Sequence, residues 1–118
     1  MARRRMFSLD VIETDRFIDM DTTARLLYYE LGMRADDEGF VSSPKMVIRT
    51  VGCSKDDLDT LIHNGFVIGF DSGVIVITHW NRQNNIPKDR FHASICKTER
   101  SSIVDIDGVY YLRSDTDT

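Results

Sequence analysis

The sequence has few of the features that mark secreted, membrane-spanning or metal-dependent proteins. Its two cysteines, Cys53 and Cys96, form no metal-binding motif, and we expect reduced thiols rather than a disulfide. No apolar run approaches the roughly 18 residues of a membrane span. The basic start, residues 1–5, leads into a stretch that is too polar for the hydrophobic part of a signal peptide. The sequence therefore predicts a cytoplasmic protein with no membrane partner.

Catalytic and metal-binding motifs are also missing. The chain has no Gly-x-Ser-x-Gly motif and no glycine-rich phosphate loop, so we predict no enzymatic activity and no cofactor. The acidic run Asp36-Asp37-Glu38 lacks the ligand spacing of a calcium loop, and a turn that caps two elements explains it more simply than a divalent-cation site. His92 and Cys96 have the i, i+4 spacing of two zinc ligands on a helix. Nothing in the spacing of the remaining His and Cys residues completes that set, so we expect no metal site.

The charge balance argues against strong binding of DNA by the whole molecule. The 15 basic and 19 acidic side chains give a net charge of −4, and such a protein is not strongly attracted to phosphates. The distribution is uneven, however, because residues 10–38 are mainly acidic and residues 79–100 are mainly basic. Local basic patches therefore remain candidates for contact with nucleic acid.

Hydrophobic periodicity and turn residues predict short helices and strands along most of the chain. Thr14 caps a helical turn, Gly52 stops a helix, and Ser54 with Asp57 forms a relative of the capping box. Residues 81–100 are predicted to be an extended loop with one helical turn. The predicted elements are a turn over 15–20, helices over 22–35, 44–51 and 54–64, strands over 40–41, 66–70 and 74–80, and a second hairpin over 103–106 and 109–112.

The order of these elements predicts an α+β fold, a winged helix-turn-helix with a β-hairpin wing and a C-terminal β-hairpin extension. Gly52 and Cys53 join the two middle helices through the short connection of a helix-turn-helix. We therefore assign residues 1–80 to a winged-helix domain with its core at 14–80, and residues 81–118 to the extension. A generic small α+β domain is the alternative.

The second helix of such a pair enters the major groove, and here it would present four hydrogen-bond donors, Lys55, Thr60, His63 and Asn64. Asp56 and Asp59 on the same face repel phosphates, so an ordinary solvated face explains this helix equally well. The tip of the wing, residues 71–73, is short and acidic and suits a minor groove poorly. Further candidates for phosphate contact are Arg3, Arg4 and Arg5 as an N-terminal arm, Lys45 and Arg49 on the preceding helix, and Arg82, Lys88 and Arg90 after the wing.

Five runs of the sequence carry a resemblance to a known family: residues 4–8, 33–45, 65–68, 72–80 and 86–91. The most specific motifs are Met-Arg-Ala-Asp-Asp at 33–37 and Lys-Asp-Arg at 88–90. On these motifs the chain resembles prophage replication proteins of Gram-positive bacteria, the replisome organisers with a DnaD-like N-terminal domain. The resemblance implies a DNA-binding winged helix in the initiation of phage or plasmid DNA replication. Its implied partners are origin DNA, a helicase or its loader, and a second copy in a homodimer.

Two departures limit what this resemblance implies. Residues 91–97 differ from the aromatic and acidic run of such proteins, and their C-terminal helical domain is not part of this sequence. Two other functions also stay open. One is a winged helix for protein contact or dimerisation with weak DNA affinity, which the acidic helix face and the net charge favour. The other is a transcriptional regulator, which would share the fold.

Overall fold

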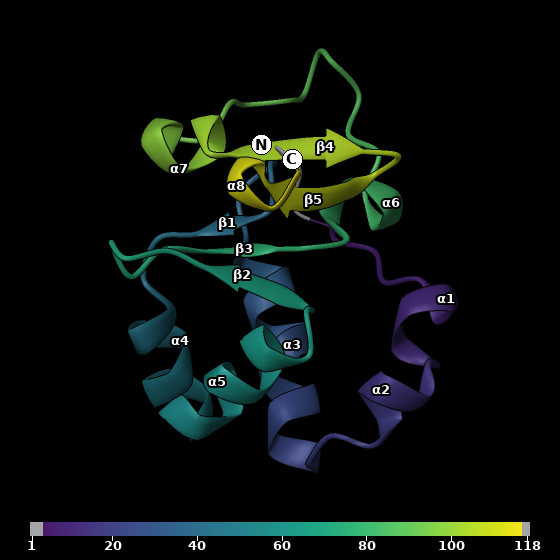
Figure 1. Cartoon of the computed structure of the whole chain (residues 1–118), viewed down its shortest axis with the longest axis vertical. Helices are drawn as coiled ribbons and strands as arrows, with labels where there is room; N and C mark the ends of the chain where they lie inside the picture. Colours follow the sequence, from purple (N-terminus) through teal and green to yellow (C-terminus); the bar gives the residue numbers. More distant parts are fainter. Residues whose placement is uncertain (1–3, 117–118) are drawn as a thin grey trace.

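The computed structural model describes residues 4–116 and combines short helices with two antiparallel sheets (Figure 1). The predicted α+β class is confirmed. In chain order the elements are α1 (Leu9–Ile12), α2 (Asp15–Ile18), α3 (Thr22–Arg34), β1 (Phe40–Val41), α4 (Pro44–Val51), α5 (Lys55–His63), β2 (Val67–Gly69), β3 (Ile75–Ile77), α6 (Trp80–Gln83), α7 (Lys97–Ser101), β4 (Ile103–Ile106), β5 (Val109–Leu112) and α8 (Arg113–Thr116).

The helices predicted between residues 22 and 64 are confirmed, and three local signals act as expected. The Thr14 side chain accepts a hydrogen bond from the Phe17 N–H and caps α2. Gly52 ends α4 in the left-handed region, with φ of 88°, where glycine carries no steric penalty. Ser54 and Asp57 form a complete capping box at the start of α5, each side chain accepting from the backbone N–H of the other residue.

The remaining predictions need three corrections. The strand predicted over 74–80 ends at Ile77, because Trp80 begins α6 and its indole N–H donates to the Asp37 carbonyl oxygen over 2.9 Å. The segment 81–100 contains helical residues at both ends, in α6 and α7, rather than in one turn. The helices α1 and α8 were not predicted, because elements of four residues are too short to show a periodic pattern.

The larger sheet has the strand order β1-β3-β2, so the first strand pairs with the last one rather than with its neighbour in sequence. Val76 in the central strand lies opposite both Phe40 and Ile68. The second sheet is the hairpin of β4 and β5, as predicted. The larger sheet lies between α3, α4 and α5 on one side and this hairpin with α7 on the other (Figure 1).

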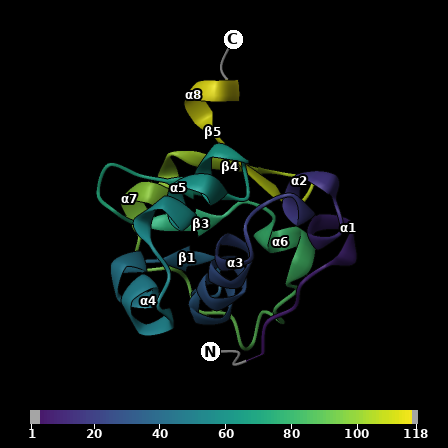
Figure 2. The same ribbon diagram turned by 90° about the horizontal axis from the view of Figure 1, so that it is seen from below.

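One hydrophobic core connects all of these layers. It contains Leu27 and Leu31 of α3, Val76 of the central strand, and Ile103 and Tyr110 of the C-terminal hairpin. The segment after residue 80 thus shares its core with the helices and the larger sheet. Around this core, α4 and the pair α1–α2 lie on opposite sides of α3 (Figure 2), which separates the surfaces that they present.

Candidate nucleic-acid interface

A short, hydrogen-bonded connection joins α4 to α5, and a side-chain hydrogen bond joins α5 to α3. The Cys53 N–H donates to the Ile48 carbonyl oxygen over 3.1 Å, which closes the connection after Gly52. The Thr23 hydroxyl donates to the Asp57 carboxylate over 2.7 Å and joins α5 to α3. Burial raises the pKa of Asp57, but the hydrogen bonds that its carboxylate accepts from Ser54 and Thr23 outweigh this effect and lower the pKa. The Asp57 carboxylate, which joins α5 to α3, is therefore ionised.

The exposed face of α5 uses part of its hydrogen-bonding capacity within the helix. Lys55 pairs with Asp59 over 3.6 Å, and both side chains are exposed. The Thr60 hydroxyl donates to the Asp56 carbonyl oxygen, and the Asn64 amide donates to the Thr60 carbonyl oxygen, both over 2.9 Å. His63 is exposed. The structure thus places Lys55, Thr60 and His63 on one short helix and Asn64 at its C-terminal cap, with Asp56 and Asp59 beside them.

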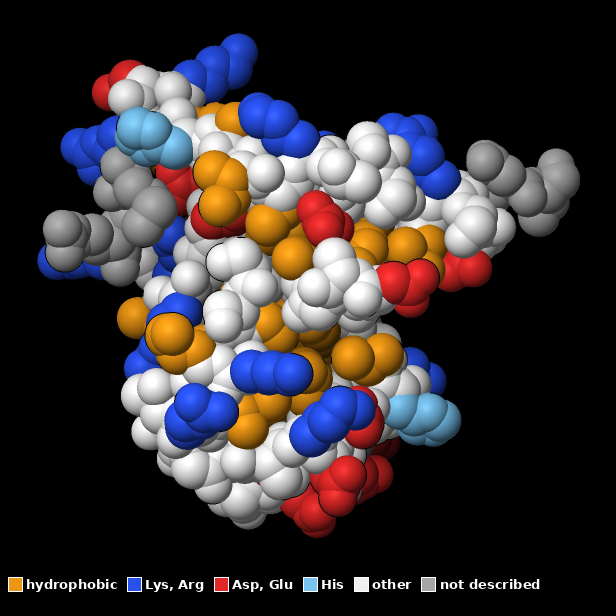
Figure 3. Space-filling view, turned by 90° about the vertical axis from the view of Figure 1, so that its left-hand side faces the viewer, with side chains coloured by type: hydrophobic (Ala, Val, Ile, Leu, Met, Phe, Trp, Pro, Cys, Tyr) orange, Lys and Arg blue, Asp and Glu red, His pale blue; other side chains and the backbone are white. Residues whose placement is uncertain are grey.

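The face of α4 is more basic than that of α5. Lys45 and Arg49 are exposed one helical turn apart, and neither makes a salt bridge with any residue of 4–116. On this side of the molecule, lysine and arginine side chains surround an apolar patch (Figure 3). Lys45 and Arg49 are therefore the best placed of the candidate residues for contact with phosphates.

The N-terminal arm is not available as a unit. Arg3 lies outside the described residues, and Arg4 is exposed. The Arg5 side chain is only 2% exposed, because its guanidinium donates to the Asp37 carboxylate over 3.2 Å and to the Ala35 carbonyl oxygen over 2.8 Å. The prediction that Arg5 contacts phosphates is therefore corrected, since this arginine holds the chain start to the body.

Arg82, the first basic residue after β3, lies away from Lys45 and Arg49. Arg82 lies on α6 and pairs with Asp107 in the β4–β5 turn over 3.2 Å, on the opposite side of α3 from α4 (Figures 1 and 2). Lys88 and Arg90 are exposed in the long connection between α6 and α7. The structure thus separates Arg5 and Arg82 from Lys45 and Arg49 instead of collecting all predicted site residues on one surface.

The acidic run 36–38 is a tight turn closed by its own first carboxylate. One oxygen of Asp36 accepts from the backbone N–H groups of Glu38 and Phe40, over 2.9 and 3.0 Å. The other oxygen accepts from the Ser94 hydroxyl over 2.5 Å. Both oxygens of Asp36 are therefore occupied by protein donors, which agrees with the interpretation of this run as a turn.

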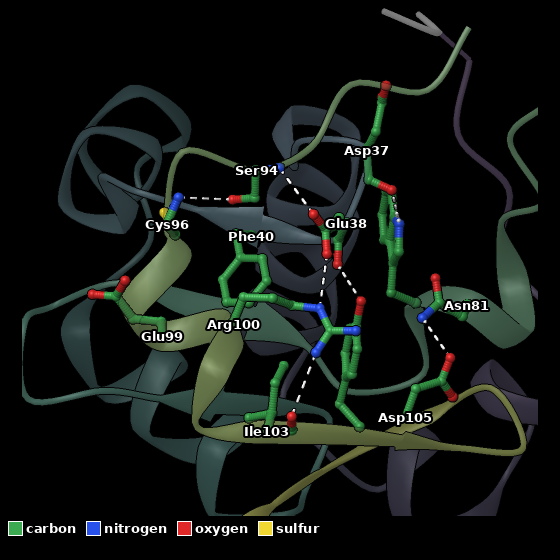
Figure 4. A network of polar contacts seen from close by, with 12 residues as sticks. Asp37, Glu38, Phe40, Asn81, Ser94, Cys96, Glu99, Arg100, Ile103 and Asp105 are labelled. Atoms are coloured by element: carbon green, nitrogen blue, oxygen red, sulfur yellow. Dashed lines mark hydrogen bonds and ion pairs between the residues drawn. The ribbon is translucent and has the colours of Figure 1, made fainter. Parts of the chain in front are cut away.

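Glu38 extends this turn into a polar network that reaches the C-terminal hairpin (Figure 4). Its carboxylate accepts from Arg100 over 2.8 Å and from the Ser94 N–H over 3.0 Å, while its carbonyl oxygen accepts from the Tyr110 hydroxyl over 2.8 Å. Burial raises the pKa of Tyr110 to about 12, so this hydroxyl keeps the proton that it donates. Sequence reasoning missed the network because its partners come from distant segments.

The i, i+4 spacing of His92 and Cys96 does not correspond to a helix. Residues 92–96 form no helix, so His92 and Cys96 do not share a helical face, and Cys96 is buried at the start of α7. Among residues 4–116 there is no group of three or more His, Cys, Asp or Glu side chains placed to hold a metal ion.

Over the same residues, no helix combines the length and apolar character that crossing a membrane requires.

Comparisons with known proteins identify no relative of this chain. No family model matches the chain, and no curated protein or solved structure shows significant similarity to it. The geometry of α4, α5 and their surroundings is therefore the basis for assigning a function.

Proposed function

We propose that this chain is a winged-helix domain that binds duplex DNA through α4 and α5, in a phage-type replication initiation protein of the cytoplasm. One observation carries the proposal: helix α3, strand β1, helices α4 and α5, and strands β2 and β3 follow one another, with β1 paired to β3. The short connection at Gly52 between α4 and α5 supports the assignment of a helix-turn-helix. The assignment to replication rests on the motif resemblance of the sequence.

The charges of the two helices favour phosphate contact over base readout. Lys45 and Arg49 are exposed cations on α4, which in a helix-turn-helix crosses the DNA backbone. The face of α5 carries Asp56 and Asp59, which repel phosphates, although a carboxylate can accept from cytosine N4. We therefore propose that α4 supplies affinity and that α5 contributes little general attraction.

The test is fluorescence anisotropy with a labelled duplex of about 20 base pairs at about 50 and 200 mM salt. Each phosphate contact steepens the dependence of log affinity on log salt by about 0.9. The double variant Lys45→Ala/Arg49→Ala should flatten this slope by about 1.8. The matched control is Arg82→Ala, which removes a cation on the far side of α3 and should leave the slope unchanged. Salt-insensitive binding, or equal slopes for both variants, would refute the proposal.

A second candidate function is a module for protein contact, including contact with a helicase, its loader or a second copy. The exposed carboxylates of Asp56 and Asp59 on the helix that should enter DNA favour it, as does the net charge of −4. Light scattering of the purified chain at two concentrations separates self-association from a monomer. A monomer without salt-sensitive DNA affinity would make contact with another protein the better assignment.

A further inference from the structure

An apolar pocket of about 350 Å³ lies between α3, α4 and the residues just before α7. Phe40, Val41 and Val47 line it as buried core residues. Met46 of α4 and Ile95 of the connection to α7 also line it, but their side chains are exposed. In the space-filling view, hydrophobic side chains run along the hollow between the two halves of the molecule (Figure 3).

The exposure of the two residues at the rim is unusually large for apolar side chains. Ile95 is 85% exposed and Met46 is 67% exposed, and they come from segments that meet only in the folded chain. A pocket of this size with adjacent exposed apolar side chains has the dimensions of a binding groove for one or two large side chains. Methionine adds a flexible surface that adapts to different ligands.

The charges around the groove are mainly positive. Lys45 precedes Met46, Lys97 follows the lining residue Cys96, and both lysines are exposed. Neither makes a salt bridge within residues 4–116. The lining itself holds one cation, Arg34, which pairs with Glu30 over 2.6 Å, and one carboxylate, Asp36, which accepts hydrogen bonds through both of its oxygens. Lys45 on the α4 side and Lys97 on the α7 side are therefore the cations that an incoming carboxylate would meet at the edge of the groove.

We propose that this groove binds an acidic amphipathic segment of a partner protein. Apolar side chains one helical turn apart in that segment insert between Met46 and Ile95, as in other helix-in-groove complexes. Flanking Asp and Glu side chains pair with Lys45 on one side and Lys97 on the other. The proposal goes beyond DNA binding and does not depend on it, because the apolar contacts involve no phosphate.

The test uses a labelled amphipathic peptide of about 16 residues, with Leu and Ile at positions i, i+3, i+4 and i+7 and Asp or Glu elsewhere. Fluorescence polarisation should show saturable binding to the full chain. A second peptide, with Lys at every acidic position, should bind at least about tenfold more weakly, since the same lysines now repel it. Binding that is absent, or equal for both peptides, would overturn the proposal.

Variants then locate the binding site. Met46→Ser and Ile95→Ser should each weaken the acidic peptide about tenfold, the loss expected for one well-buried apolar contact. Lys97→Glu should weaken it about fivefold. The matched control is Ile106→Ser, which removes a half-exposed isoleucine at the far end of the β4–β5 hairpin and should change nothing. Unchanged binding by both Met46→Ser and Ile95→Ser would place the peptide elsewhere and refute the groove.

Two further measurements distinguish peptide binding at the groove from DNA binding and from self-association. The variants Met46→Ser and Ile95→Ser keep the charge of the chain, so they should bind duplex DNA as the unmodified protein does. Equal loss of DNA and peptide binding would mean that both ligands contact the same side chains and would overturn a separate groove. Light scattering should show a monomer. A dimer that Ile95→Ser dissociates would identify a second copy as the occupant and refute the proposed partner.

Discussion

Replacement of Arg5 by alanine should destabilise the protein far more than the replacement of any neighbouring basic residue. The side chains of Arg5 and Asp37 are 2% and 0% exposed, and their charged atoms lie 3.2 Å apart. The variant also removes the hydrogen bond to the Ala35 carbonyl oxygen and the guanidinium that lies 5.3 Å from the centre of the Trp80 ring. Asp37 would keep the His92 N–H as a donor, but its charge would be buried without a counterion.

The expected loss is about 3–5 kcal/mol, the usual cost of removing one partner of a buried ion pair. With a urea dependence of about 2 kcal/mol per molar, this loss lowers the midpoint of unfolding by about 2 M. Trp80 is the single tryptophan and is buried, so its fluorescence reports the transition, with circular dichroism as a second probe. Arg4→Ala, at an exposed position, is the control and should stay within about 0.5 kcal/mol of the unmodified protein.

A companion variant tests the cause of this loss. If the isolated charge of Asp37 is responsible, then Asp37→Asn in the Arg5→Ala background should recover part of the lost stability, because no unpaired carboxylate remains. The reasoning is refuted if Arg5→Ala unfolds at the same urea concentration as Arg4→Ala. It is also refuted if the added asparagine lowers stability further, since packing rather than charge would then dominate.

Three further predictions concern single positions. Gly39→Ala should lower the free energy of unfolding in urea by about 3 kcal/mol, because φ is +93° and a Cβ would lie 2.6 Å from the Trp80 ring. Gly52→Ala is the control, with φ of +88° and open space around it, and should cost only about 1 kcal/mol. Equal losses of stability would contradict the close contact between residue 39 and Trp80. Burial lowers the pKa of His79, so the unfolded chain takes up a proton more readily than the folded one. The contribution of His79 to stability is therefore complete above about pH 6.5 and decreases as the pH falls below that value. His79→Gln should lose this pH dependence, and identical stability profiles for both proteins would refute the role of His79. Ser54→Ala should cost about 1 kcal/mol through the lost cap, and an unchanged unfolding midpoint would show that the cap contributes nothing.

The parts of the fold that could be predicted from the sequence are those with local causes. Ser54 and Asp57 are three residues apart, and their reciprocal hydrogen bonds need no tertiary contact. Asp107 and Gly108 both have positive φ, 55° and 86°, which is the turn that a two-residue hairpin loop requires. Such signals fix where elements begin and end, so the strand and helix order along the chain followed from them.

The surroundings of the candidate site were less predictable, because the ion pairs that fix the basic side chains join segments that are distant in the sequence. The partners in the pairs Arg5–Asp37 and Arg100–Glu38 lie 32 and 62 residues apart in sequence, and no periodicity connects them. In the sequence, nothing links Arg5 to its partner Asp37, so Arg5 was predicted to be a free basic residue that contacts phosphates. The apolar groove was not predicted for the same reason, since Met46 and Ile95 line one pocket only because the connection to α7 lies beside α4.

The placement of the acidic residues explains how an acidic chain can expose basic side chains at α4. Arg5 and Arg100 pair with Asp37 and Glu38 in the turn, and these pairs leave the net charge of the other side chains at −4. Many of the remaining acidic residues lie between positions 10 and 21, on and around α1 and α2, which α3 separates from α4 (Figure 2). The acidic residues of α1 and α2 therefore have little effect on a ligand at α4, because salt screens exposed charges that are more than about 10 Å away. An anionic ligand at α4, whether a phosphate backbone or an acidic segment, consequently meets Lys45 and Arg49 before it meets the carboxylates of α1 and α2.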